Sequence, residues 1–388
     1  MCFEITRSTD SQRQGCRHNE IQRQRSIISS PNFSPAHKPS SIIPANSRVP
    51  ALDGVRGLAV LMVLLDHASD SHMRIFGVNL NSAGGLGVQL FFVLSAFLLT
   101  SACCTAKPDD LEKLTYWARY AWRRIMRVFP LYALVLVVLA ATQRIEWESV
   151  FPHLMLHEGE RQMWSIGVEV KYYILLPFLA IGVLSAVRMR WWSAIVAAGV
   201  FVGSTALIFH WEEIWAPEEN MWLSQNIQAF VVGSGIAFVS SLLLPWARSV
   251  RWLPRMWETC AWAALLLVLL RIPGIHHAFG MEKEALAFLD DNTTFCAILW
   301  PIVLLGVLHG SGALRWIFSF WPLRALGWIS FSAYLWHREF LFIGKHHALP
   351  DYLSLPLYLL VVLAISTISY LLIERPLSRW EFPFKART

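Results

Sequence analysis

Charged residues are scarce in this sequence. Asp, Glu, Lys and Arg together make up only 15% of the 388 residues, whereas 55% are hydrophobic. A soluble globular domain is closer to one quarter charged. The low charge therefore argues against an ordinary soluble enzyme, and the mean hydropathy of +0.44 indicates a protein that crosses a membrane several times.

Several chemical motifs are also missing. The six cysteines form no CxxC pair, so the sequence predicts neither a disulfide framework nor a zinc site. It contains no Gly-rich phosphate loop, no Gly-x-Ser-x-Gly motif and no cluster of metal ligands, so we expect no metal and no tightly bound cofactor. The pI of about 9.1 does not indicate nucleic-acid binding, because Lys and Arg concentrate in loops between apolar segments.

The chain is rich instead in apolar segments long enough for a transmembrane helix, which needs about 20 residues. They predict an all-α polytopic protein that lies in the lipid bilayer and has about ten transmembrane helices. These segments lie at about residues 51–69, 84–104, 125–142, 164–184, 191–209, 226–245, 256–272, 293–310, 324–343 and 354–374. In the sixth segment, Gly233 and Gly235 would allow a neighbouring helix to pack closely.

The ends of the chain differ from its middle. Residues 1–47 are polar and basic and lack apolar periodicity, so we expect a disordered cytosolic tail before a transmembrane domain at 48–380 and a short cytosolic tail at 381–388. Basic residues concentrate in every second loop, and the positive-inside rule therefore places both termini in the cytoplasm of a cell-membrane protein. The few basic residues of the opposite loops include Arg144 and Arg161.

The first apolar segment carries two ionisable residues that are eleven positions apart, Arg56 and His67. This spacing places both side chains on one face of a helix, separated along its axis by roughly 16 Å. An ionisable group within a membrane is a functional candidate by default. The alternative is that Arg56 extends to a headgroup and His67 marks the far interface.

The third predicted helix begins with a group of arginines. Arg123 and Arg127 lie one helical turn apart, and Arg124 lies between them. Guanidinium groups suit phosphate, so this group is a candidate phosphate site on the cytosolic side. Arginines at this place could also serve only to set the topology.

The fourth predicted helix begins with Trp164 and carries a carboxyl group one turn further on. Ser165 and Glu169 share one face because they are four residues apart. A glutamate buried in lipid without a function is uncommon, so we interpret Glu169 as a functional residue. The alternative is a purely structural carboxylate that the nearby Lys171 neutralises.

The ninth predicted helix contains a polar stripe of Ser330, Tyr334 and His337 at helical spacing. A histidine beside an aromatic belt could also be a simple interfacial residue. With the topology above, His67, Glu169 and His337 would form one site toward the outer face, and the arginines would form a second site at the cytosolic face.

Several of these motifs occur together in a known order. The chain resembles the acyltransferase 3 family of integral membrane acyltransferases, which includes O-antigen and exopolysaccharide O-acetylases. The resemblance extends over about residues 50–380. It rests on residues 52–57 with His67, 87–99, 123–132, 164–165 with Glu169, Tyr173 and Pro177, 329–330 with 334–337, and 373–376. Two positions depart from the family pattern, since Gln89 stands where the family commonly has Asp and Ala96 where it commonly has Gly.

The resemblance implies a cytosolic acyl-CoA donor, with acetyl-CoA favoured, and a hydroxyl of a saccharide or similar acceptor at the outer half of the membrane. The expected donor-binding residues are Arg56, Arg123, Arg124 and Arg127, and the expected substrate contacts are Trp164, Ser165, Ser330 and Tyr334. We expect His67 to act as general base, oriented or charge-stabilised by Glu169. His337 or Glu169 remains an alternative base.

A function of another class also fits some of these features. Intramembrane His and Glu residues could form the proton relay of a proton-coupled transporter. The sequence shows no internal repeat of the kind many transporters have. That absence and the order of the motifs favour the acyltransferase.

Overall fold

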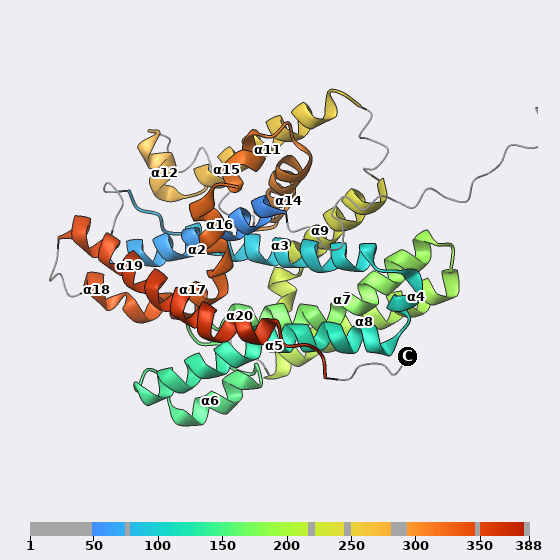
Figure 1. Cartoon of the computed structure of the whole chain (residues 1–388), viewed down its shortest axis with the longest axis horizontal. Helices are drawn as coiled ribbons and strands as arrows, with labels where there is room; N and C mark the ends of the chain where they lie inside the picture. The colour runs from blue at the N-terminus through green and yellow to red at the C-terminus, as the bar shows by residue number, and fades with distance from the viewer. Residues whose placement is uncertain are drawn as a thin grey trace, which may run out of the picture. The chain divides into compact units, whose positions relative to one another are not determined.

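The computed structural model describes residues 49–73, 78–215, 222–243, 250–280, 293–345 and 350–383, and this part of the chain is helical without a β-strand (Figure 1). The all-α prediction is confirmed. The predicted tail at 1–47 and most of the tail at 381–388 lie outside the described residues. The helices are α2 (Pro50–Asp70), α3 (Ala83–Thr105), α4 (Pro108–Leu111), α5 (Leu114–Ala141), α6 (Trp147–Leu154), α7 (Trp164–Val187), α8 (Trp191–Trp215), α9 (Leu223–Phe238), α11 (Leu253–Leu270), α12 (Pro273–Ala278), α14 (Thr293–His309), α15 (Ala313–Phe318), α16 (Trp321–Trp328), α17 (Ser330–Trp336), α18 (Phe342–Lys345), α19 (Asp351–Ser369) and α20 (Arg375–Ser378).

Three short segments have other helical geometries. A 3-10 turn, η4 (His337–Phe340), follows α17, and π-helical turns follow α9 and α19 as η2 (Val239–Leu243) and η5 (Tyr370–Glu374). A π-helical turn inserts an extra residue and changes the direction in which side chains point. In η5 this turn ends at the buried carboxyl group of Glu374.

Six helices in the described part of the chain are long and apolar enough to cross a membrane. They are Ala83–Thr105, Leu114–Ala141, Trp164–Val187, Trp191–His210, Leu253–Leu270 and Leu353–Ser378. The other four predicted segments also contain helix, but α2 carries several charges, α9 and α14 are shorter, and α16 is separate from α17. The chain is therefore a multi-pass membrane protein, and the count of about ten spans stays a prediction.

The predicted helix at 324–343 is not continuous, which corrects the expectation of a single stripe through Ser330, Tyr334 and His337. The chain turns at Ile329 between α16 and α17, and His337 begins the 3-10 turn η4. α16 packs along α2, whereas α17 packs on α19 and keeps a smaller contact with α2. The turn at Ile329 is where the contact with α19 is added.

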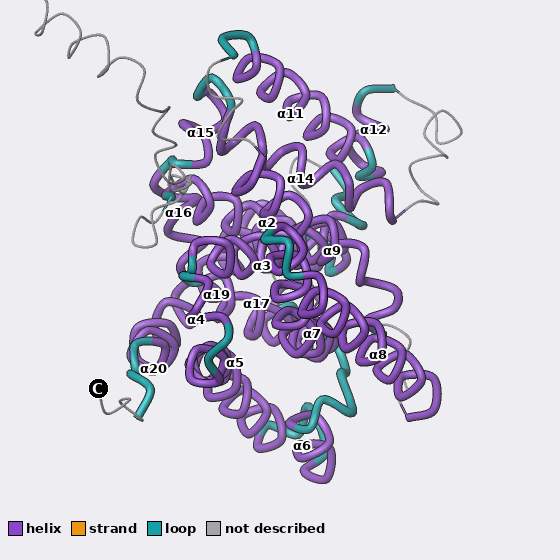
Figure 2. The backbone as a smooth tube through the Cα atoms, turned by 90° about the vertical axis from the view of Figure 1, so that its right-hand side faces the viewer, coloured by secondary structure: helices purple, strands orange, loops and turns teal. Residues whose placement is uncertain are grey.

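Helices α2 and α3 lie among the other helices, as Figure 2 shows. The carboxylate of Asp66 near the end of α2 accepts hydrogen bonds from the backbone N–H groups of Ser82, Ala83 and Gly84, which begin α3. The first N–H groups of a helix have no partner within the helix, so Asp66 supplies the missing acceptor and joins the two helices. A Cβ atom on Gly84 would lie 2.6 Å from the Asp66 Oδ2 atom, so a side chain there would displace the Asp66 carboxylate.

Glycine also allows α3 and α9 to pack closely. A Cβ atom on Gly233 would lie 2.4 Å from the carbonyl oxygen of Val93, which confirms the prediction for this residue. No atom of the described residues lies within 4 Å of the corresponding position on Gly235, so these residues do not bear out the prediction for Gly235. The two glycines are two positions apart and point to different sides of α9, and α3 packs on one of them.

The packing of α2 on α15 and α16 is closer still. Cβ atoms on Gly54, Gly57 and Gly327 would lie 1.7, 1.9 and 1.8 Å from the backbone carbonyl oxygens of Phe318, Leu323 and Asp53. The two backbones therefore touch without intervening side chains, as at the small-residue interfaces of membrane helices. This contact fixes the position of Asp53 and Arg56 relative to the start of α17.

We expect Gly57→Ala to destabilise the protein, because the added methyl group would meet backbone that cannot move independently. Overpacking of this kind costs ~1–3 kcal/mol or more. The thermal unfolding midpoint in detergent, followed by size-exclusion chromatography, should fall. Gly199→Ala in α8 is the matched control, since no atom lies within 4 Å of its added Cβ position. Equal midpoints for the two variants would contradict the packing argument.

Candidate functional site

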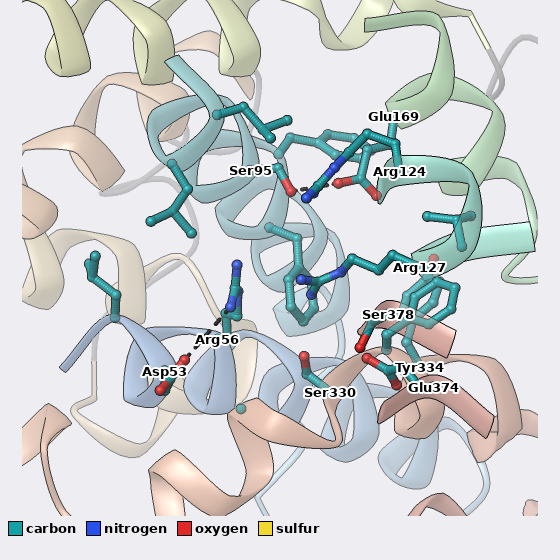
Figure 3. Close-up of a pocket in the computed structure, with 18 of the residues that line it drawn as sticks. Asp53, Arg56, Ser95, Arg124, Arg127, Glu169, Ser330, Tyr334, Glu374 and Ser378 are labelled. Carbon is teal, nitrogen blue, oxygen red and sulfur yellow. Dashed lines mark hydrogen bonds and ion pairs between the residues drawn. The ribbon is translucent and has the colours of Figure 1, made fainter. Parts of the chain in front are cut away.

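A cavity of about 460 Å³ lies between α2, α3, α5, α7, α17 and η5. Volumes of this size are typical of small-molecule sites. Ten polar residues that line it are labelled in Figure 3: Asp53, Arg56, Ser95, Arg124, Arg127, Glu169, Ser330, Tyr334, Glu374 and Ser378. The two positions that depart from the family pattern, Gln89 and Ala96, do not line the cavity.

Three arginines reach this cavity from two helices (Figure 3). The Arg56 Nη1 atom lies 3.7 Å from the Asp53 Oδ1 atom, and Trp328 donates a hydrogen bond of 3.2 Å to the other oxygen of Asp53. Arg124 and Arg127 form no ion pair with any described residue, and the Arg124 guanidinium lies 5.9 Å from the ring centre of Tyr173. Neither guanidinium group is held in an ion pair by a described residue, although the carboxylates of Glu169 and Glu374 line the same cavity.

Only two of the three arginines predicted at the start of the third helix line the cavity. Arg124 and Arg127 line the cavity from α5, whereas Arg123 is exposed and donates a hydrogen bond of 3.3 Å to the carbonyl oxygen of Arg119. Residues three apart share a face of a helix, and the face that carries Arg124 and Arg127 is the one that α5 presents to the cavity. Arg123 therefore lies outside the candidate site.

Glu169 lies among the arginines and not beside the histidines. Its Oε1 atom accepts a hydrogen bond of 2.5 Å from Ser95 in α3, and Arg124 lies next to this pair (Figure 3). The expected division into a cytosolic arginine site and a separate His–Glu–His site is therefore wrong, because Glu169 and Arg127 line one cavity. The prediction used only the depth of Glu169 in the membrane, which does not show which neighbouring helix the side chain faces.

Ser165, Ser330 and Tyr334, which were predicted as substrate contacts, line the cavity, and their role stays a prediction. The hydroxyl of Ser165 donates a hydrogen bond of 2.8 Å to the hydroxyl oxygen of Tyr334. Trp164 does not line the cavity; its ring packs edge-on against Phe92, with ring centres 6.1 Å apart. Trp164 therefore serves packing in this structure.

The two histidines meet at the far end of this arrangement. The rings of His67 and His337 are stacked, with centres 5.1 Å apart and an angle of 18° between the planes. The ring of Tyr334 lies 5.7 Å from that of His337. Tyr334 therefore connects the cavity to the histidine pair, which begins where the cavity lining ends.

His337 is completely buried, and its hydrogen bonding fixes its tautomer. The Nδ1 atom lies 2.6 Å from the carbonyl oxygen of Tyr334, which can only accept, so Nδ1 carries the proton in the neutral ring. The Nε2 atom is then an acceptor, and it has no hydrogen-bond partner among the described residues. A buried lone pair without a partner is uncommon and marks a site where a donor can bind.

His67 is more open, since 27% of its side chain is exposed, and it faces two carboxylates. Its Nδ1 atom lies 3.6 Å from Asp66 Oδ2 and 3.7 Å from Asp70 Oδ2. Burial and the charge of Arg338 disfavour a positive charge on the ring, whereas Asp70 favours it. Because Nδ1 faces the acids, Nε2 is available as an acceptor. The ligand atoms of Asp66, His67 and Asp70 lie within 4.8 Å of one another, but Asp66 already binds the start of α3, so we assign no metal to this group.

The structure adds two functional candidates that lie in the motifs of the resemblance but were not predicted as site residues. Ser95 is one serine in an apolar run, and only its contact with Glu169 distinguishes it. Glu374 is buried in η5, where its Oε2 atom accepts a hydrogen bond of 2.9 Å from Ser332. The position of Glu374 at the end of an apolar helix was visible in the sequence, but its direction depends on the π-helical turn.

Comparison with known proteins identifies the family of the chain. The family model for the acyltransferase domain of the acyltransferase 3 family matches residues 49–374. The peptidoglycan O-acetyltransferase OatA of Listeria monocytogenes is 24% identical over 74% of this chain and 49% of its own length. YrhL of Bacillus subtilis, provisionally named a peptidoglycan O-acetyltransferase, is 25% identical over 85% of this chain and 55% of its own length.

The chain thus spans about half the length of the curated relatives it matches. No solved structure matches it. The family model covers most of the chain, including the cavity-lining residues from Val49 to Glu374 and both histidines. The chain belongs to the acyltransferase 3 family.

Proposed function

We propose that this protein is a membrane O-acyltransferase that transfers an acetyl group from acetyl-CoA to a hydroxyl of a saccharide or similar acceptor. The observation that carries the proposal is the continuous arrangement from two unpaired arginines, through Tyr334, to a stacked histidine pair. The names of the relatives, which refer to O-acetylation of peptidoglycan, support a saccharide acceptor.

The proposed donor enters the cavity from the cytosolic side, where the sequence places the start of α5 and both termini. Phosphate groups of coenzyme A would bind Arg124 and Arg127, which have no competing carboxylate within ion-pair distance in the described structure. The acyl arm would then extend along α2 toward Tyr334 and the histidines. Glu169, held by Ser95, would contact this arm and not the base.

The proposed chemistry is acyl transfer at the histidine pair. His67 Nε2 takes the proton of the acceptor hydroxyl while the hydroxyl oxygen attacks the thioester carbonyl carbon. The new ester C–O bond forms, the C–S bond breaks, and the proton passes from His67 to the coenzyme A thiolate. Asp66 and Asp70 stabilise the transient imidazolium, as the third group does in other acid–base sites. His337 holds the ring of His67 by stacking.

Release of thiol from acetyl-CoA by the purified protein in proteoliposomes is the direct test. An acetyltransferase supplied with envelope glycan releases coenzyme A and forms an acetyl ester. A proton-coupled transporter would leave acetyl-CoA intact. Intact acetyl-CoA with a folded protein and a broad glycan mixture would overturn the proposed function.

We expect Arg127→Ala to weaken acyl-CoA binding about 10- to 100-fold, because a hydrogen-bonded contact to a charged group is lost. Added salt should weaken binding to the unmodified protein as well, since the attraction is largely electrostatic. Equilibrium binding of a fluorescent acyl-CoA measures both effects. Arg123→Ala is the matched control, because Arg123 lies on the same helix but outside the cavity. Equal acyl-CoA affinity in the two variants would mean that the arginines only set the membrane topology.

We expect His67→Ala to lower kcat by about 10²- to 10⁴-fold, which is the usual contribution of a positioned base. Donor affinity should change little, since His67 does not line the cavity. Single-turnover kinetics with radiolabelled acetyl-CoA separate these two effects, and His277→Ala at an exposed position serves as control. Full activity in His67→Ala, together with loss in His337→Ala, would transfer the role of base to His337.

A further inference from the structure

A second group of arginines lies beyond the histidine pair, away from the cavity. It consists of Arg144, Arg161 and Arg338 around the nearly buried Glu339, and we name it the distal arginine cluster. The Arg161 Nη2 atom lies 2.9 Å from Glu339 Oε1, and the Arg144 Nε atom lies 4.0 Å from Glu339 Oε2. One carboxylate is therefore shared by two arginines.

The third arginine of the cluster has no such partner. Arg338 forms no ion pair or side-chain hydrogen bond with the described residues, and its Nε atom is buried and unpaired. The charged groups that act on it are Arg161, Glu339 and Asp70, and Glu339 and Asp70 already face Arg161 and His67. A half-buried guanidinium in this setting needs an anion, because an unpaired buried charge is costly.

The distal arginine cluster borders the proposed reaction centre. Arg338 follows His337 in the chain, and its charge acts on the rings of both His67 and His337. The charge of Arg161 also acts on His337. An anion bound at Arg338 would therefore lie close to a hydroxyl that His67 deprotonates.

Neither topology nor local folding accounts for the whole cluster. Arg144 and Arg161 lie on either side of α6, in the part of the chain where the positive-inside rule predicts few basic residues. Their ion pairs with Glu339 join this part to η4, which explains two arginines as structural. That role does not extend to Arg338, which joins nothing in the described structure.

We propose that the distal arginine cluster, with Arg338 at its centre, binds an anionic group of the acceptor, a carboxylate or a phosphate close to the hydroxyl that is acylated. The proposal rests on the proposed function and narrows the acceptor to an acidic saccharide. Guanidinium groups bind carboxylate and phosphate oxygens through paired hydrogen bonds, which orients the anion as well as attracting it.

The test uses the full chain in proteoliposomes, radiolabelled acetyl-CoA and glycan fragments from a cell envelope. The fragments are deacetylated with base and separated by anion exchange into a neutral and an anionic fraction. We expect the label to enter the anionic fraction. Carbodiimide coupling to methylamine and phosphatase treatment then distinguish a carboxylate from a phosphate, since only the treatment that removes the recognised anion abolishes labelling.

The variants separate binding from chemistry. Arg338→Gln should raise the acceptor KM about 10-fold or more, as expected for loss of a charge-assisted hydrogen bond, while donor affinity changes little. Arg338→Lys keeps the charge and should restore part of the loss. Arg251→Gln, at an exposed position before α11, is the matched control.

Three outcomes would overturn this inference and leave the acyltransferase proposal intact. They are labelling of the neutral fraction, thiol release without labelling of either fraction, and an unchanged acceptor KM in Arg338→Gln. Retention of the anionic fragments by immobilised protein provides a readout independent of turnover. The unmodified protein could retain the anionic fragments, and lose this retention in Arg338→Gln, without ever consuming acetyl-CoA. That result would overturn the proposed function and support the anion site. Equal retention by both proteins would overturn the anion site.

Discussion

The backbone contact between α2 and the α15–α16 segment is the constraint on which the site depends. Gly54, Gly57 and Gly327 let two helical backbones touch, and any side chain at these positions would overlap a carbonyl group. The contact fixes the rotation of α2, so that Arg56 points into the cavity and His67 emerges three turns later. It also fixes the start of α17, which brings His337 onto His67.

Polar groups connect the remaining helices to this frame. Asp66 binds the start of α3, Ser95 of α3 binds Glu169 of α7, and Ser165 of α7 binds Tyr334 of α17. In a low-dielectric membrane interior such bonds are specific, because an unpaired polar group there is costly. The same bonds that join the helices therefore position the cavity-lining residues. In the proposed function, the donor and the acceptor would meet the histidine pair from opposite ends, each end carrying arginines.

Much of this could be predicted from the sequence, but not the way the parts meet. Apolar length located the helices, and charge in apolar segments identified Arg56, His67, Glu169 and His337. The pairing of Glu169 with Ser95 was not predictable, because spacing along one helix does not show which neighbouring helix it faces. The break at Ile329 was hidden for a related reason, since the apolar pattern continues through it while α19 is added to α2 as a packing partner.

The central claim is that one path joins the unpaired arginines of α5 to the stacked histidines. A cryo-EM structure of the full chain in nanodiscs with a non-hydrolysable acetyl-CoA analogue measures this most directly. The account predicts phosphate oxygens within hydrogen-bond distance of Arg124 and Arg127, and the acyl end beside Tyr334 and the His67–His337 pair. An analogue whose phosphates lie away from both arginines, or whose acyl end lies away from the histidines, would contradict it.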